Sequence, residues 1–294
     1  MLLTKRYSFQ LYLPLFPGGI SEEKNVGCLF AIQNGAEFIW DFDSNNQGIL
    51  DISSISILNS MSVLQRCRGQ HKLFNPYPYF GVNECYIWPR GFPLEFARDA
   101  LTRPELCKGN ISFKSVGVIQ AIANTEPDVD ATFRFTREYP TTFETTYKFP
   151  FILVPRDSYC PFNEHATLWT KQAFRYIALP ISVHSRVSDI WRSYIAQLFF
   201  HRMGINLLFS PPYVVQTSGD QNILVDFQAE MDLYKKSNSL IDFLQTFQFH
   251  PNTTLEYVYE ELYRRHFFTL EDVYFIRIWT KSFSDVSVSN EMSS

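Results

Sequence analysis

The sequence predicts an α/β domain with a mixed β-sheet flanked by helices, and its first third already shows the pattern. Residues 21–32 carry early acids and then apolar residues at helical spacing, and Gly35 follows as a typical helix end. The apolar run at 37–41 comes next and is short enough for a buried strand. Together with a strand expected at 9–15, these segments make a strand–helix–strand unit, the building block of a parallel sheet.

The remaining two thirds continue to mix strands and helices. We expect part of 51–67 to be helical, and a long amphipathic helix at 188–203 that Gly204 closes. The segment 224–280 is expected to be mostly helical, and the Ser-rich tail at 282–294 to be disordered. Further strands are expected at 116–123, 132–136, 149–154 and 205–209, with the last stopped by Pro211 and Pro212.

Composition indicates a well-packed globular chain, and we expect residues 1–281 to form a single domain. Of the 294 residues, 46% are hydrophobic and 17% aromatic, which supplies a large core and argues against intrinsic disorder. The formal net charge of −4 gives no electrostatic footprint for nucleic acid, so no nucleic-acid partner is expected. We find neither an apolar run of roughly 20 residues nor a signal peptide, so the chain as given is expected to be soluble.

Several common site chemistries have no motif in this chain. The five cysteines include no C-x-x-C pair, and the six histidines lack the spacing of a zinc hydrolase. An odd cysteine count leaves at least one thiol unpaired, so the redox compartment stays open. Two N-glycosylation sequons are present, and they matter only if the chain enters the secretory pathway: Asn110-Ile-Ser112 and Asn252-Thr-Thr254.

The strongest chemical signal is a pair of carboxylates, Asp41 and Asp43, at the end of the apolar run. In open α/β sheets, ligands bind at the carboxyl ends of the strands. Two carboxylates at that position can hold a divalent cation that in turn binds a ligand diphosphate. The competing interpretation is simple turn chemistry, because residues 44–46 are also good turn formers.

A set of blocks in a fixed order resembles one protein family. The blocks are Gly27-Cys-Leu-Phe-Ala-Ile-Gln-Asn-Gly35, Asp41-Phe-Asp43, Trp88-Pro-Arg-Gly-Phe-Pro, Pro127-Asp-Val-Asp130, Asp189-Ile-Trp-Arg-Ser-Tyr194 and Ser210-Pro-Pro212. Together they resemble the glycosyltransferase-like domain of the plant STELLO proteins and a related nematode family, over roughly residues 20–280. The same layout is more distantly similar to the reversibly glycosylated polypeptides, which act as UDP-arabinopyranose mutases.

The resemblance implies a GT-A-like nucleotide-sugar-binding fold and a glycosyltransferase that takes a nucleotide sugar, expected to be UDP-linked, in the Golgi. It implies residence at the Golgi membrane on the lumenal side, with a membrane anchor in full-length relatives that this chain lacks. The first strand of the nucleotide-binding half is likewise expected to be missing. Two alternatives stay open: a catalytically inactive scaffold or trafficking protein acting through protein contacts, and a nucleotide-sugar mutase in solution.

The resemblance also assigns a metal site and a catalytic residue. Asp41 and Asp43 would bind Mn²⁺ or Mg²⁺ together with the donor diphosphate. Asp189 would act on the acceptor side, as general base in an inverting enzyme or as a stabiliser of an oxocarbenium-like centre in a retaining one. The alternative for Asp189 is a helix-start acid, with Arg192 as its ion-pair partner.

Five further residues receive a substrate-binding role from the resemblance: Trp88, Arg90, Asp128, Asp130 and Arg192. An arginine fork suits phosphate oxygens or a sugar hydroxyl, and a tryptophan ring can pack against a sugar. Each has a structural alternative. Trp88 would then be a core residue, Arg90 would pair with a carboxylate such as Glu84 or Asp99, and the two aspartates would be turn formers.

Overall fold

The structure is a computed structural model that describes residues 20–42, 46–48, 60–80, 87–97, 104–137, 141–143, 151–217 and 222–291. Its centre is an eight-stranded sheet in which seven strands follow the order β1-β7-β5-β8-β6-β3-β4, while β2 pairs with β8. The strands are β1 (Phe38–Phe42), β2 (Asn46–Gly48), β3 (Ser60–Arg66), β4 (Leu106–Ser112), β5 (Val116–Thr125), β6 (Phe151–Leu153), β7 (Ala166–Thr170) and β8 (Asn206–Gln216).

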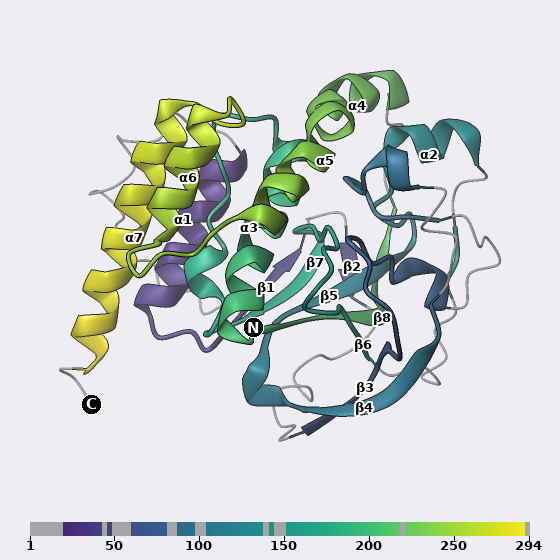
Figure 1. The fold of residues 1–294 in the computed structure, drawn as a ribbon, viewed down its shortest axis with the longest axis horizontal. Helices are drawn as coiled ribbons and strands as arrows, with labels where there is room; N and C mark the ends of the chain where they lie inside the picture. Colours follow the sequence, from purple (N-terminus) through teal and green to yellow (C-terminus); the bar gives the residue numbers. More distant parts are fainter. Residues whose placement is uncertain are drawn as a thin grey trace.

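Seven α-helices accompany the sheet in the described part of the chain, and Figure 1 shows α1, α6 and α7 gathered side by side. The helices are α1 (Ile20–Gln33), α2 (Ala131–Thr136), α3 (Ser185–Met203), α4 (Ile223–Ala229), α5 (Met231–Thr246), α6 (Leu255–Arg264) and α7 (Leu270–Glu291). This mixed sheet with flanking helices confirms the predicted α/β class and is consistent with a GT-A-like fold. None of the described helices combines the length and the apolar character needed to cross a membrane.

Strand directions bring three carboxyl ends to one edge of the sheet. Strand β7 runs antiparallel to both β1 and β5, whereas β5 and β8 are parallel. Strands β1, β5 and β8 therefore point the same way, and the beginning of β7 lies among their ends. This is the edge at which open α/β sheets bind ligands.

The core is built on both faces of the sheet and is largest where α3 packs. Helix α3 is buried from Val187 to Phe200, and its Trp191 and Tyr194 are among the largest fully buried side chains. Strand β5 is buried along nearly its whole length, so it contributes side chains to both faces. Burial at this scale, at about 25 cal/mol per Å² of apolar surface, fixes α3 firmly against the sheet.

Several sequence-based expectations are confirmed by the described residues. Helix α1 is followed by Gly35 at φ +77°, and α3 is closed by Gly204 at φ +74°, a left-handed conformation that glycine adopts without steric cost. The strands expected at 116–123 and 149–154 are present as β5 and β6. Helices α4 to α7 occupy most of the segment from Leu224 to Thr280.

Other expectations were wrong, for identifiable reasons. The strand expected at 132–136 is helix α2, because the Asp130 side chain accepts a hydrogen bond from the Phe133 N–H and caps a helix start. Within 51–67, expected to be helical in part, Ser60–Arg66 forms strand β3 between β4 and β6, and residues 51–59 lie outside the described part of the chain.

Strand β8 does not stop at Pro211 and Pro212 but runs on to Gln216. Its pairing with β5 shifts register between Ala121 and Ala123, opposite these prolines. A proline lacks the N–H needed for the ladder, and an irregularity is where a strand tolerates it.

The next two expectations concern strand β1 and the C-terminal tail. Among the described strands, β1 pairs antiparallel with β7. The strand expected at 9–15 lies outside the described residues, so the predicted parallel unit stays a prediction. Residues 282–291, expected to be disordered, form the last turns of α7.

Candidate functional site

The carboxyl edge of the sheet carries a charged cluster in which Lys24 bridges two carboxylates. Asp41 lies near the end of β1, opposite Thr167 of β7, and Glu164 precedes β7 by two residues. The Lys24 Nζ atom, from α1, is 3.2 Å from Asp41 Oδ1 and 3.3 Å from Glu164 Oε1. The three side chains are only partly accessible, so their charges interact through protein more than through water.

Glu164 is the member of this cluster with an unused hydrogen-bond acceptor. Its side chain is 12% exposed, and its Oε2 atom is buried without a hydrogen-bond partner among the described residues. Burial, with a further contribution from the negative charge of Asp189, raises the pKa of Glu164 to about 7. A buried carboxylate oxygen left without a donor is uncommon and indicates a place where a cation or a polar ligand group fits.

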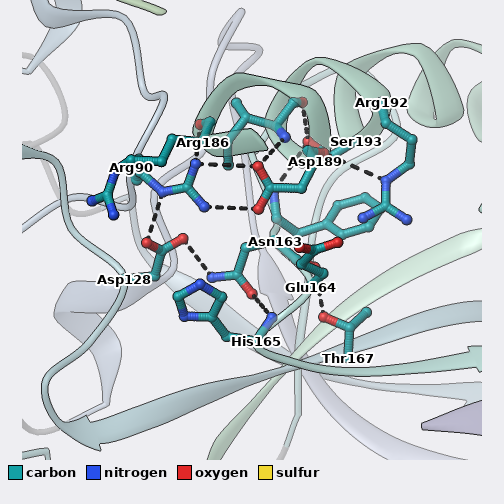
Figure 2. A network of polar contacts seen from close by, with 12 residues as sticks. Arg90, Asp128, Asn163, Glu164, His165, Thr167, Arg186, Asp189, Arg192 and Ser193 are labelled. Carbon is teal, nitrogen blue, oxygen red and sulfur yellow. Dashed lines mark hydrogen bonds and ion pairs between the residues drawn. The ribbon is translucent and has the colours of Figure 1, made fainter. Parts of the chain in front are cut away.

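Arg192, on α3, also has a side-chain nitrogen that makes no hydrogen bond within the described residues. Its guanidinium stacks over the Trp169 ring at 4.6 Å, and its Nη1 donates to the Ile177 carbonyl at 3.1 Å. The Nη2 atom is buried without a hydrogen-bond partner in the described structure. Figure 2 shows Arg192 and Glu164 on the same side of Asp189. Glu164 Oε2 and Arg192 Nη2 are therefore a hydrogen-bond acceptor and a hydrogen-bond donor that the described residues leave unused.

The centre of the site is a buried ion-pair network around Arg90, shown in Figure 2. The Arg90 Nε atom donates to Asp128 Oδ1 at 2.8 Å, and its Nη2 donates to Asp189 Oδ2 at 2.7 Å. Its Nη1 donates to Asp189 Oδ1 at 3.1 Å and also to the carbonyl of Arg186. The guanidinium thus ties the loop after β5 to the first turns of α3, using its rigid fork in the two-oxygen manner typical of arginine.

The opposite charges in this network offset the cost of burying Arg90 and Asp128. Arg90 and Asp189 are each 2% exposed. Burial alone would lower the pKa of Arg90, but Asp128 and Asp189 more than offset it and hold it above its usual value. Burial would likewise raise the pKa of Asp128, and the adjacent Arg90 instead holds it below its usual range. Arg90 and Asp128 each offset part of the cost of burying the other's charge.

Asp189, assigned the catalytic role by resemblance, is fully engaged in this network. Both of its oxygens accept from Arg90, and Oδ1 also accepts from the Ile190 N–H at 2.8 Å. In this arrangement Asp189 anchors the start of α3 and has no free oxygen directed at solvent. Its catalytic role stays a prediction that requires Arg90 to release it.

Trp88 and Asp130 are buried next to the Arg90 network, two residues from Arg90 and Asp128 respectively. The Trp88 Nε1–H donates to Asp130 Oδ2 at 2.6 Å, and the indole packs edge-on against Phe133 at 5.3 Å. Trp88 is 8% exposed, so its ring faces the core. Burial raises the pKa of Asp130 to about 6 although three hydrogen bonds to its carboxylate act against it. Trp88 fits its structural alternative as a core residue, whereas Asp130, for which the alternative was a turn former, is the N-cap of α2.

One short segment, Asn163–His165, joins the two charged groups. Asn163 Nδ2 donates to Asp128 Oδ2 at 2.7 Å, while the next residue, Glu164, reaches Lys24. His165 Nδ1 lies 3.2 Å from Gln216 Oε1 at the end of β8. The segment therefore contacts both the Arg90 network and the cluster at Asp41.

The structure therefore brings together most of the residues that the sequence assigned to the site. Arg90, Asp128 and Asp189 form one network, with Arg192 beside it, and Asp41 lies at the same edge of the sheet. Asp43 lies outside the described residues, as do both carboxylates considered as partners of Arg90, namely Glu84 and Asp99.

Sequence reasoning missed Lys24, Asn163 and Glu164. A polar triplet just before the apolar run at 166–170 was a usable signal. It pointed to this edge only once β7 was known to run antiparallel, since the start of an antiparallel strand lies beside the ends of its neighbours.

The side chains present suit a hard divalent cation. Mg²⁺ and similar ions are usually bound by one or two carboxylates together with phosphate oxygens, and Asp41 and Glu164 supply such oxygens, one of them without a partner. In the described part of the chain, no three His, Cys, Asp or Glu side chains are grouped closely enough to hold a metal. A cation here would accordingly depend on the diphosphate of a ligand for part of its coordination.

Comparison with known proteins identifies relatives. A family model described as STELLO glycosyltransferases matches residues 186–290, a range that includes Asp189 and Arg192. Two Arabidopsis thaliana proteins, named "Probable glycosyltransferase STELLO1" and "Probable glycosyltransferase STELLO2", are each 30% identical over 274 residues. The aligned region is 87% of this chain but only 34% and 35% of those two proteins, so the chain spans about a third of their length. The predicted resemblance is confirmed.

Proposed function

We propose that this STELLO-like chain is a metal-dependent glycosyltransferase that uses a nucleotide sugar, a UDP-sugar, as donor and a glycan or protein as acceptor. The observation that carries the proposal is the Asp41–Lys24–Glu164 cluster at the carboxyl edge of the sheet, with Glu164 Oε2 buried and unpartnered. Mg²⁺-type ions are commonly bound by one or two carboxylates together with phosphate oxygens, which is the ligand type that Asp41 and Glu164 offer.

Each described residue has a definite part in this proposal. Asp41 and Glu164 would hold Mn²⁺ or Mg²⁺, with Asp43 as the second carboxylate of the Asp-x-Asp pair. When bound, the cation neutralises charge that develops on the departing diphosphate. Lys24 holds the two carboxylates in place when no cation is present. The unused Nη2 of Arg192 suits a donor oxygen, and the Arg90 network keeps α3 and the Asn163–His165 segment rigid around the site.

A lumenal Golgi location is part of the proposal and has independent support in the disulfide between Cys67 and Cys107. This bond joins strands β3 and β4 across a Cα–Cα distance of 5.1 Å, a normal separation. Disulfides persist in oxidising compartments such as the secretory pathway and are rare in reducing ones.

The test is calorimetric titration of the purified chain with UDP and UDP-glucose, with and without Mn²⁺. We expect binding that requires Mn²⁺ in the wild type and is lost in Asp41→Asn. The matched control is Asp242→Asn, which also removes one ion-paired carboxylate, at a side chain that is 60% exposed and pairs with Lys72. Binding that survives in Asp41→Asn, or needs no metal, contradicts the proposed site.

One observation favours a second function, a catalytically inactive scaffold or trafficking protein. Asp189 is buried and both of its oxygens are bonded to Arg90, so no general base is free at that position. If well-folded protein binds neither nucleotide in either condition, this second function replaces the first. Binding without sugar transfer to any acceptor in a screen would point to a donor-binding protein that has lost catalysis.

A further inference from the structure

Both sequon asparagines lie on the surface with amides that the fold does not use. Asn110 lies on strand β4, and Asn252 lies in the turn between α5 and α6; both side chains are exposed. Neither amide makes a hydrogen bond within the described residues. In contrast, Asn25, Asn75 and Asn163 are buried and their amides hold distant segments together. The two sequons therefore offer asparagines that can be modified without breaking a contact.

The hydroxyl residue of each sequon is also exposed, although the Thr254 hydroxyl accepts a hydrogen bond from the Tyr257 N–H. The hydroxyl residues at the third position, Ser112 and Thr254, are exposed, and the intervening positions are Ile111 and Thr253 and not proline. Enzymes that modify asparagine read this N-x-S/T pattern, and a bulky, hydrophilic glycan can remain only where it projects into water.

Asn110 lies on an antiparallel strand pair that also carries a second mark of the secretory pathway. Cys107, three residues earlier on β4, forms the disulfide with Cys67, which follows β3. Disulfide formation and asparagine glycosylation take place in the same lumenal route, so the two features support one another although they rest on different chemistry.

We propose that Asn110 and Asn252 carry N-linked glycans. The proposal rests on the lumenal location argued above. In the reaction, the asparagine Nδ2 forms a bond to the anomeric carbon of an oligosaccharide delivered on a lipid diphosphate. The bond from that carbon to the diphosphate oxygen breaks, the lipid diphosphate leaves with the electron pair, and the amide nitrogen loses one proton.

The position of Asn110 gives its glycan a physical consequence. Strand β4 is the last strand in the order β1-β7-β5-β8-β6-β3-β4, whereas Asp41 lies on β1 at the other end. A glycan on β4 therefore leaves the candidate site open. Among the described strands β4 pairs only with β3. An exposed strand edge can associate with other chains, and a bulky hydrophilic group beside it hinders such pairing.

The experiment is expression of the full chain in cells with a secretory pathway, followed by digestion with an enzyme that releases N-linked glycans. We expect the wild type to shift in gel mobility in two steps on partial digestion. Asn110→Gln and Asn252→Gln should each lose one step, and the double variant both. The control is Asn34→Gln, an exposed asparagine outside any sequon, which should keep both steps.

A parallel arm places a cleavable secretion signal in front of the same chain. Absence of any shift in this arm overturns the exposure argument, and a shift that persists in the double variant overturns the assignment to these two residues. If the change in gel mobility appears only when the secretion signal has been added, the proposal is overturned for the chain without that signal. The nucleotide titration uses bacterial protein without glycans, so its failure and a failure here are separate results.

Discussion

Arg90 and Asp189 form a two-oxygen buried ion pair that joins residues 99 positions apart in the sequence. The same guanidinium holds Asp128, so one cation compensates two carboxylates in the protein interior. The Asn163 amide and the Ile190 N–H supply further donors to these carboxylates. The arrangement is stable as a unit and costly to interrupt, because removing one member leaves another charge buried and unpaired.

Arg90→Met is expected to lower the free energy of unfolding by about 3–5 kcal/mol, since Asp128 and Asp189 lose their common partner in a dry environment. Denaturant unfolding followed by circular dichroism measures the change. The control is Arg264→Met, which breaks an ion pair at a side chain that is 57% exposed and should change stability little. Equal effects of the two substitutions would show that the network does not stabilise the fold.

Gly91 follows Arg90 at φ +81°, and a Cβ atom there would lie 2.2 Å from the Ile190 Cγ2 atom on α3. Gly91→Ala is expected to cost about 1–2 kcal/mol for the left-handed backbone, and about 1–3 kcal/mol more for the clash next to Asp189. Gly35→Ala is the matched control, because it has φ +77° but no atom within 4 Å of the added Cβ. Thermal unfolding of both variants isolates the steric part, and similar losses would contradict the close approach of Gly91 to α3.

Glu164→Gln is expected to change how stability depends on pH. The pKa of Glu164 is raised by burial to about 7 from 4.5, so the folded state binds the proton more tightly than the unfolded state. The associated stability is fully present below about pH 4.5 and is lost as the pH rises through about 7. The wild type should therefore lose on the order of 2 kcal/mol relative to Glu164→Gln between pH 4.5 and 8.

Unfolding curves across this pH range test the expectation for Glu164. Glu23→Gln on α1, where the side chain is exposed, serves as control and should follow the wild type. The acid limb below about pH 4 should be common to all three proteins, because Asp128 stabilises the fold only while it is ionised. A wild-type curve parallel to that of Glu164→Gln would exclude a raised pKa for Glu164.

Replacing both Cys67 and Cys107 by serine is expected to lower stability by about 2–4 kcal/mol, because the bond restricts a loop of 40 residues in the unfolded chain. Unfolding with and without reductant provides the measurement. Cys160→Ser on its own does not serve as control, since this thiol is fully buried; the half-buried free Cys28 is the better choice, as Cys28→Ala. Reductant should affect the wild type and Cys28→Ala alike and leave the double variant unchanged.

Local sequence patterns predicted the elements whose signals are contained within a few residues. Helix α1 and its glycine end, the strand that ends at Asp41, and the closure of α3 by Gly204 all depend on caps and periodicity. The same kind of reasoning failed at 132–136. There the capping hydrogen bond that Asp130 accepts from the Phe133 N–H outweighed the apolar pattern.

The residues of the candidate site also fall into two groups: those that sequence motifs selected and those that only the tertiary structure revealed. Ordered motifs were enough to select Arg90, Asp128 and Asp189, but not to show that they bind one another. Lys24 and Glu164 carry no motif of their own. They became part of the site because α1 packs beside the sheet and β7 runs antiparallel, which places its start next to the end of β1.

The sequence by itself determined the α/β class, the acidic strand end and the family resemblance, because caps, periodicity and ordered motifs are written in neighbouring residues. The tertiary structure alone decided which charges are compensated and which polar atoms remain unused. Those outcomes depend on strand order and direction, which bring Lys24, Asp41 and Glu164 within contact distance across 140 positions of chain. No local pattern encodes such a juxtaposition, since it results from the packing of the whole sheet.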